Sequence, residues 1–133
     1  MRVLAPGALD VGIVLDSSTD VSTSNWQRII AFVRAFVGRF PNVSPTADGT
    51  RFGLISYARK PAVHFNFRTL EGSKLNAGQV QALVSQTPRE PGLGRRIDLA
   101  LQMAERKLFS NIGGTREGAK KVRLNCNLKC SSW

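Results

Sequence analysis

Apolar and polar positions follow one another in blocks that predict a strand and then a helix. Residues 9–15 form an almost continuous apolar run that ends at Asp16, a pattern typical of a central parallel strand covered on both faces. From Trp26 to Phe40, apolar residues recur every three or four positions, which predicts a long amphipathic helix that ends at Pro41. The chain therefore opens with a strand, a polar loop and a helix.

Two more strands are predicted after this helix, and the short link between them predicts how they pair. We expect one strand at 52–57 and a second, alternating one at 62–67. The intervening residues are too few for a helical crossover, so these strands should be antiparallel neighbours. Along the second of them, Val63 and Phe65 should point inward and His64 outward into solvent.

The second half of the chain predicts a short helix at 77–84, a longer helix at 96–109 and one more strand beginning at 120–124. The resulting order of strands and helices is β-α-β-β-α-α-β. It predicts an α/β fold with an open, mostly parallel, Rossmann-like sheet, an antiparallel edge strand and helices on both faces. Such sheets bind ligands at the carboxyl ends of their strands. The loop 16–22, directly after the first strand, is therefore the expected functional site.

Charge is distributed unevenly along the chain. The net charge is +10, and the whole excess falls in residues 51–133, because residues 1–50 carry as many acidic as basic side chains. A basic excess can indicate nucleic acid, heparin-like polyanions or anionic membranes as partners. However, no run of five Lys or Arg residues occurs, and no apolar stretch is long enough to span a membrane. We expect no specific nucleic-acid binding and no membrane span.

The two cysteines, Cys126 and Cys130, both lie in the last eight residues. Two cysteines make neither a disulfide framework nor a zinc site, which normally needs four ligands. They are either two incidental thiols or one local disulfide. The opening residues 1–6 lack the apolar core of a signal peptide.

Four segments, in matching order and spacing, resemble the von Willebrand factor type A (VWA, integrin I-like) family. They are residues 10–18, 26–28, 52–58 and 96–101. The sequence is most similar to extracellular-matrix repeats of the matrilin, collagen VI and coadhesin kind. The resemblance implies a partial, C-terminally truncated domain over 9–124 and a divergent cysteine-containing tail over 125–133. Without the last strands of such a domain, the strand at 120–124 should be an exposed edge, which invites aggregation.

The resemblance also implies a metal-ion-dependent adhesion site (MIDAS). The family pattern is Asp-x-Ser-x-Ser after the first strand, a Thr before the third helix and an Asp after the fourth strand. These oxygens suit Mg²⁺, and an open coordination position accepts a carboxylate from the partner. In this sequence Asp16 and Ser18 match, Asp20 replaces the second serine, and the threonine position falls on Arg95. The fourth-strand aspartate has no equivalent.

Arg95 has only donors and a permanent charge, so it cannot ligate a cation. We expect its guanidinium to take the place of the metal and to form a charge-assisted fork to Asp16 or Asp20. The alternative is that Arg95 points into solvent and that Asp16, Ser18 and Asp20 keep a weak contact with Mg²⁺. In either case these four residues are the predicted ligand-binding site.

Three functions remain open at this point. By resemblance, the chain is an extracellular, non-enzymatic adhesion module that binds a matrix or cell-surface protein. It could instead be a basic domain that binds heparin-like polyanions, or a truncated fragment without independent function. The residues that would carry polyanion binding are Arg89, Arg95, Arg96, Arg106, Lys107, Arg116, Lys120, Lys121 and Arg123. No acid–base pair or nucleophile constellation predicts an enzyme.

Overall fold

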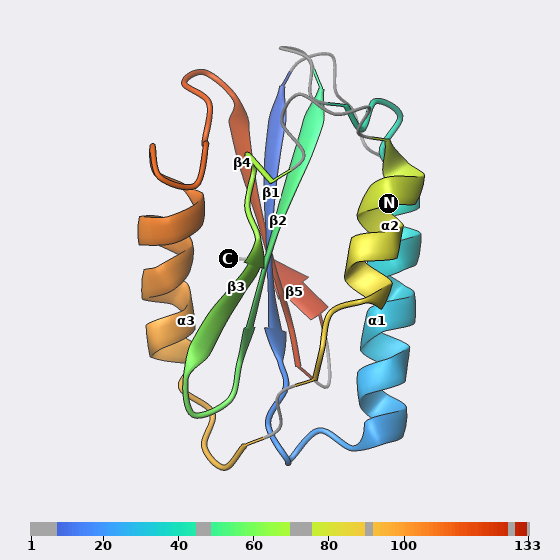
Figure 1. Ribbon diagram of the computed structural model, residues 1–133, viewed down its shortest axis with the longest axis vertical. Coiled ribbons are helices and arrows are strands. Elements are labelled where there is room, and N and C mark those ends of the chain that lie inside the picture. The colour runs from blue at the N-terminus through green and yellow to red at the C-terminus, as the bar shows by residue number, and fades with distance from the viewer. Residues whose placement is uncertain (1–7, 45–48, 70–75, 90–91, 128–129, 133) are drawn as a thin grey trace.

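A central twisted sheet with helices on both faces organises the computed structural model of this chain (Figure 1). Its strands lie in the order β3-β2-β1-β4-β5. The arrangement confirms the predicted open α/β sheet, mostly parallel with an antiparallel edge. The residues that the structure describes are 8–44, 49–69, 76–89, 92–127 and 130–132.

The first strand in the sequence lies at the centre of the sheet. β1 (Leu9–Asp16) pairs in parallel with β2 (Thr50–Tyr57) on one side and with β4 (Lys120–Cys126) on the other. β3 (Pro61–Phe65) is antiparallel to β2, and β5 (Cys130–Ser132) is antiparallel to β4. Because the neighbours of β1 run in its direction, the carboxyl ends of β1 and β2 meet at the same edge of the sheet.

Helices cover the two faces unequally. α1 (Thr23–Gly38) and α2 (Ala77–Ser85) lie together on one face, while α3 (Ile97–Met103) and its π-helical continuation η1 (Ala104–Leu108) lie on the other (Figure 1). α1 begins at a cap in which the Ser22 hydroxyl accepts a hydrogen bond from the third residue of the first turn. No helix among the described residues is long and apolar enough to cross a membrane.

β1 is buried along its whole length because both of its faces are covered. Val11 and Ile13 belong to the core beneath α1, and Val14 belongs to the core beneath α3 and η1. At Gly12, a Cβ would lie 2.7 Å from the ring of Phe109. A glycine at this position therefore lets the segment after η1 pack directly against the strand.

The expected orientation of two residues in β3 was wrong. The ladder between β2 and β3 shifts register between Leu54 and Ile55, which leaves His64 as an extra residue on β3, as in a β-bulge. Val63 is therefore 36% exposed. His64 is half-buried, with its Nε2 2.6 Å from the hydroxyl of Ser56. Alternation along the sequence could not reveal the inserted residue.

The edge expected at β4 is covered only at the carboxyl end of the strand. β4 continues to Cys126, and β5 pairs with residues 124–126 of β4. Cys126 is disulfide-bonded, and the only other cysteine of the sequence, Cys130, is its backbone register partner on β5. Of the two readings of the cysteines, this favours the local disulfide.

Candidate functional site

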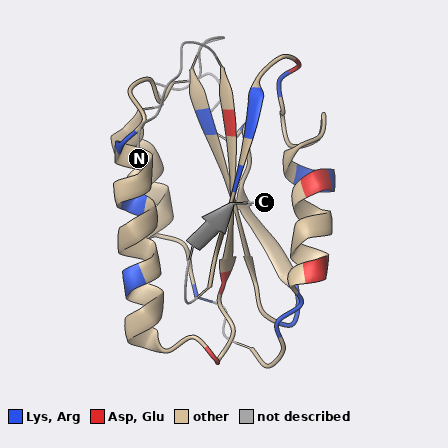
Figure 2. Ribbon diagram, turned by 180° about the vertical axis from the view of Figure 1, so that it is seen from behind, with Lys and Arg blue, Asp and Glu red and all other residues tan. Residues whose placement is uncertain are grey.

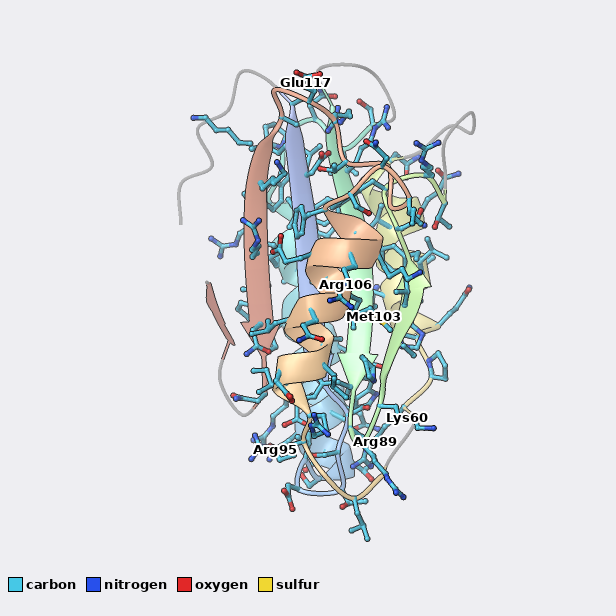
Figure 3. All side chains as sticks on the ribbon, turned by 90° about the vertical axis from the view of Figure 1, so that its left-hand side faces the viewer. Lys60, Arg89, Arg95, Met103, Arg106 and Glu117 are labelled. Carbon is cyan, nitrogen blue, oxygen red and sulfur yellow. The ribbon has the colours of Figure 1, made fainter. Side chains whose placement is uncertain are left out.

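Three loops meet at the carboxyl ends of β1 and β2. The loop that follows β1 is joined to the loop before α3 by a hydrogen bond of 3.1 Å from the Thr19 N–H to the Gly92 carbonyl. The loop after β2 is joined to the same segment by a bond of 2.9 Å from the Arg96 N–H to the Ala58 carbonyl. Figure 3 shows Arg95, together with Arg89 and Lys60, at this end of the molecule. We call this surface the loop face, formed by residues 16–22, 58–60, 87–89 and 92–98.

Asp16 is the buried carboxylate of the loop face. It is 0% exposed, and its two oxygens have different partners. Oδ1 accepts a hydrogen bond of 2.9 Å from the Ser18 N–H, and Oδ2 accepts one of 2.8 Å from Arg95 Nε. The hydrogen bond and the charge of Asp16 raise the pKa of Arg95 above its ordinary value. Arg95 is therefore a permanent cation held against a buried anion.

The end of β1 is also fastened to the end of β2. The Ser17 N–H and hydroxyl both donate to the Tyr57 carbonyl, at 2.8 Å and 3.1 Å. Burial, assisted by the negative charge of Asp16, raises the pKa of Tyr57 to about 12. Ser18 is buried next to them, and its hydroxyl oxygen has no hydrogen-bond partner within the described part of the chain. Most hydrogen-bonding groups at the start of the loop after β1 are therefore paired, which holds this part of the loop in place.

Arg89 fixes the other end of this loop. Its guanidinium donates to the carbonyl of Ser18 at 3.2 Å, to the carbonyl of Val21, and to the hydroxyl of Thr23 at 3.3 Å. From the sequence, Arg89 was expected only as a candidate polyanion contact, and this positioning role was not predicted. Backbone carbonyls are the main partners, and every residue type has one, so no sequence signal could have identified them.

The structure contains the expected ion pair of Arg95 but not the expected geometry. Arg95 pairs with Asp16, one of the two partners expected, but through a single nitrogen and not as a two-point fork. Asp20 is exposed, and it shares no hydrogen bond or ion pair with Arg95 among the contacts of the described residues. The loop face therefore brings Asp16, Ser18 and Arg95 together and leaves Asp20 at its rim.

The residues of the loop face do not fit a divalent cation as they are arranged. Both oxygens of Asp16 already accept hydrogen bonds, and one of those donors is a guanidinium, whose positive charge repels a cation at contact distance. In the portion of the chain that the structure describes, no group of three or more His, Cys, Asp or Glu side chains could hold a metal ion.

A second buried carboxylate, which the sequence analysis did not single out, lies at the opposite end of β1. Asp10 is 0% exposed and is paired with Arg116, whose Nη2 lies 2.8 Å from Asp10 Oδ1. The Arg116 N–H and the Thr115 hydroxyl donate to the other oxygen, at 2.8 Å and 3.1 Å. A charged residue inside an apolar run was the available signal, because a buried charge needs a partner. Figure 2 shows acidic positions toward both ends of the sheet, with basic positions near them.

The structure does not gather the candidate polyanion residues on one surface. Arg95 lies at the carboxyl end of β1, whereas Lys120 and Lys121 pair with the first residues of β1. The length of an eight-residue strand, roughly 25 Å, separates these two groups. Arg123 is bound by Glu105 at 2.9 Å.

Comparison with known proteins identifies relatives over most of this chain. The von Willebrand factor type A domain model matches residues 10–124. Integrin alpha-2 of Bos taurus is 32% identical over 90% of the chain, and vitrin of Homo sapiens is 25% identical over 86%. The chain covers only 9% and 16% of the length of these two proteins.

Solved structures agree with this result at the level of the fold. Proximal thread matrix protein 1 from the mussel byssus, in a structure with a zinc-occupied MIDAS motif, superposes with a TM-score of 0.76 at 21% identity. The match covers 90% of this chain and 28% of that one. A second structure of the same mussel protein gives a TM-score of 0.73 at 23% identity.

Proposed function

This chain belongs to the von Willebrand factor type A domain family, and on that premise we propose that it is an extracellular adhesion module that works without a divalent cation. It binds a matrix or cell-surface protein through the loop face. The ion pair between Arg95 and the buried Asp16 carries the proposal. The guanidinium supplies, at the end of β1, the positive charge that a metal ion supplies in a MIDAS.

Two features support a binding role for the loop face in particular. It lies at the carboxyl ends of the strands, where open α/β sheets place their ligands. Its backbone is held by the hydrogen bonds of Ser17, Thr19 and Arg89, so little conformational freedom is lost on binding. The relatives include an integrin and a mussel byssus matrix protein, and these names favour adhesion over catalysis.

The test is binding of the labelled chain to a surface coated with decellularised matrix extract, in Mg²⁺ and in EDTA. We expect equal binding in both, and about tenfold weaker binding for Arg95→Ala, the loss typical of an interface arginine. Arg106→Ala is the matched control, because it removes an exposed arginine from η1 with the same change in charge. Binding that is lost in EDTA would overturn the proposal.

Thermal unfolding provides a second test of the cation-free site. Adding millimolar Mg²⁺ should leave the Tm unchanged, since a ligand that does not bind the folded state cannot stabilise it. A saturable rise in Tm with Mg²⁺ would show instead that Asp16, Ser18 and Asp20 hold a cation.

Polyanion binding is the second candidate, and the net charge of +10 favours it. This function predicts that the affinity for immobilised heparin falls steeply with salt and is unaffected by EDTA. The affinity should also weaken equally in Arg95→Ala and Arg106→Ala. The adhesion proposal predicts that only Arg95→Ala matters. Because the candidate basic residues lie at opposite ends of the sheet, we favour adhesion.

A further inference from the structure

We propose that the outer edge of β4, over residues 120–122, binds an extended acidic segment of a partner protein as an additional strand of the sheet. This goes beyond the proposed function, because the edge lies away from the loop face. Lys120 and Lys121 pair with the first two residues of β1, whereas Arg95 binds Asp16, the last residue of that strand. We call residues 120–122 the β4 edge.

The β4 edge carries backbone groups that have no strand to pair with among the described residues. The Lys120 N–H donates to the Ala8 carbonyl at 3.0 Å, so residue 120 turns its backbone groups toward β1. Successive residues of a strand turn these groups to opposite sides. Lys121 therefore turns its N–H and its carbonyl outward, away from β1.

β5 does not cover this part of β4. It pairs only with residues 124–126, and Figure 3 shows it beside one end of β4, while the other end lies at the margin of the described sheet. A row of unpaired backbone groups at a sheet margin is a template for another chain. Extended segments of partner proteins bind such edges by adding a strand, with hydrogen bonds between the main chains.

Charge at the β4 edge disfavours a second copy of this chain and favours an acidic partner. Lys120 and Lys121 are both exposed, and neither forms an ion pair within the described part of the chain. If two copies paired through residues 120–122, lysines would lie next to lysines, and like charges on neighbouring strands are destabilising. Acidic side chains in the same positions would be stabilising. The lysines therefore select against self-association and for an acidic strand.

The two faces of β4 define which side chains the added strand should carry. Val122 packs against the core beneath α1, so Lys121, its neighbour in sequence, points to the face of α3 and η1. On that face Arg123 is already used, because its guanidinium lies over the ring of Phe109 and pairs with Glu105 at 2.9 Å. Lys121 is the charge that remains there for a partner. We expect an acidic side chain opposite Lys121 and an apolar one opposite Val122.

The direction of the added strand fixes the order of these side chains. β5 is antiparallel to β4, and antiparallel pairing is slightly more stable per residue than parallel pairing. A segment added in this direction meets Val122 first, then Lys121 and then Lys120. It should therefore carry an apolar residue followed by two acidic residues, within a stretch of about six residues, a typical strand length.

The test is titration of the isotopically labelled 133-residue chain with the synthetic peptide Thr-Thr-Val-Glu-Glu-Thr, followed by nuclear magnetic resonance. We expect saturable shifts of the backbone amide signals around Lys121 and slower exchange of the Lys121 amide with solvent. Two control peptides are tested on the unchanged chain. One has lysines in place of both glutamates, and the other is N-methylated at the first glutamate, whose N–H would donate to the Lys121 carbonyl. Neither control should bind, because the first is repelled and the second lacks that donor.

Variants of the chain separate the charge from the backbone. Lys121→Ser keeps the N–H and should weaken binding about threefold, the effect of a cross-strand charge pair. Lys107→Ser is the matched control, because Lys107 is an exposed lysine of η1 beside β3, at the opposite edge of the sheet. Lys121→Pro removes only the outward N–H, which an edge strand tolerates, and should weaken binding about fivefold. If Lys121→Pro does not fold, the N-methylated peptide still tests the backbone contact.

Several results would overturn this inference. They are the absence of any shift at Lys121 with millimolar peptide, equal binding of either control peptide, and unchanged affinity in Lys121→Ser. Dimerisation that shifts the Lys121 amide would assign the edge to a second copy of the chain. An edge that bound heparin oligosaccharides but not the peptide would be a polyanion site instead.

The outcome does not depend on the adhesion proposal. Arg95→Ala should bind the peptide normally, because Arg95 lies at the other end of β1. If matrix binding needs Arg95 but the peptide leaves the Lys121 amide unchanged, this inference fails and the adhesion function stands. If the peptide binds the β4 edge but matrix binding is lost in EDTA, the proposed function fails and this inference stands.

Discussion

The two ends of β1 each hold a buried carboxylate paired with an arginine, but the two pairs are built for different purposes. Asp10 at the start of the strand and Asp16 at its end are both 0% exposed. Arg116, the partner of Asp10, is 15% exposed, whereas Arg95, the partner of Asp16, is 43% exposed. We call the pair at the start of the strand closed, because its arginine is mostly buried, and the pair at the end open, because its arginine is largely exposed to solvent.

The hydrogen bonds show the same contrast. Arg116 holds Asp10 through Nε and Nη2, and Nη2 also donates to the carbonyls of Leu9 and Gly49, at 2.9 Å and 2.7 Å. Arg95 makes one hydrogen bond within the described part of the chain. A buried ion pair is stable only when its remaining donors and acceptors are satisfied. Arg116 meets that condition within the chain, so we infer that it is structural, while Arg95 keeps donors available for a partner.

The largest effect is expected for Arg116→Ala. Removing Arg116 leaves the Asp10 carboxylate buried without its counter-ion, which costs about 3–5 kcal/mol for such pairs. Urea unfolding followed by tryptophan fluorescence should show this loss in the free energy of unfolding, or a chain that no longer folds. A loss below about 1 kcal/mol, the range of surface ion pairs, would show that the closed pair is not structural.

A smaller loss is expected for Asp10→Asn. The amide is nearly the same size as the carboxylate and keeps one acceptor oxygen, but it leaves the Arg116 charge in a largely buried position. Hydrogen bonds to charged groups contribute about 1.5–3 kcal/mol, and we expect a loss in that range by the same urea experiment. The matched variant at the open end, Asp16→Asn, should cost less, because Arg95 can turn its charge into water.

Arg95→Ala should cost about 1 kcal/mol, well below Arg116→Ala. Asp16 loses one hydrogen bond, but it keeps the bond from the Ser18 N–H, and water can enter where the half-exposed guanidinium lay. Because water can replace the guanidinium beside the Asp16 carboxylate, we expect a loss near the upper end of the range for surface ion pairs, between 0 and about 1 kcal/mol. If this variant lost as much stability as Arg116→Ala, the distinction between an open and a closed pair would be wrong.

The sequence predicted those parts of the fold that repeat a strong pattern. The apolar run of β1 and the helical spacing of α1 were visible because their burial is continuous. The bulge at His64 was not, since one inserted residue changes pairing and not composition. β5 was also missed, because its three residues are polar or small and pair through backbone groups that every sequence has.

The site was predictable only where one residue departed from a family pattern. Arg95 could be placed opposite Asp16 because an arginine stood at a position where the family has a hydroxyl. Arg116 could not be assigned to Asp10, because 106 residues separate them and no pattern links the two. Long-range pairs of this kind are fixed by the topology of the sheet, which brings the loop before β4 back to the start of β1.

The last prediction concerns Tyr57, which reports on the open end of β1. Burial, and then the charge of Asp16, raises its pKa to about 12, from 10.0 for the free side chain. The folded protein thus favours the protonated phenol. The contribution of Tyr57 to the free energy of unfolding should therefore be fully present below pH 10. It should fall as the pH rises from 10 towards 12, because over this range the phenol ionises in the unfolded chain but not in the folded one.

This titration can be followed without ambiguity, since Tyr57 is the only tyrosine in the chain. Ultraviolet absorbance of the tyrosinate gives its pKa in each folded variant. Asp16→Asn removes a negative charge beside the phenol and should lower the Tyr57 pKa. Asp10→Asn, at the far end of the strand, should leave it unchanged. If Asp16→Asn also had no effect, Arg95 would already neutralise Asp16 completely, and the guanidinium would have less charge to offer a partner.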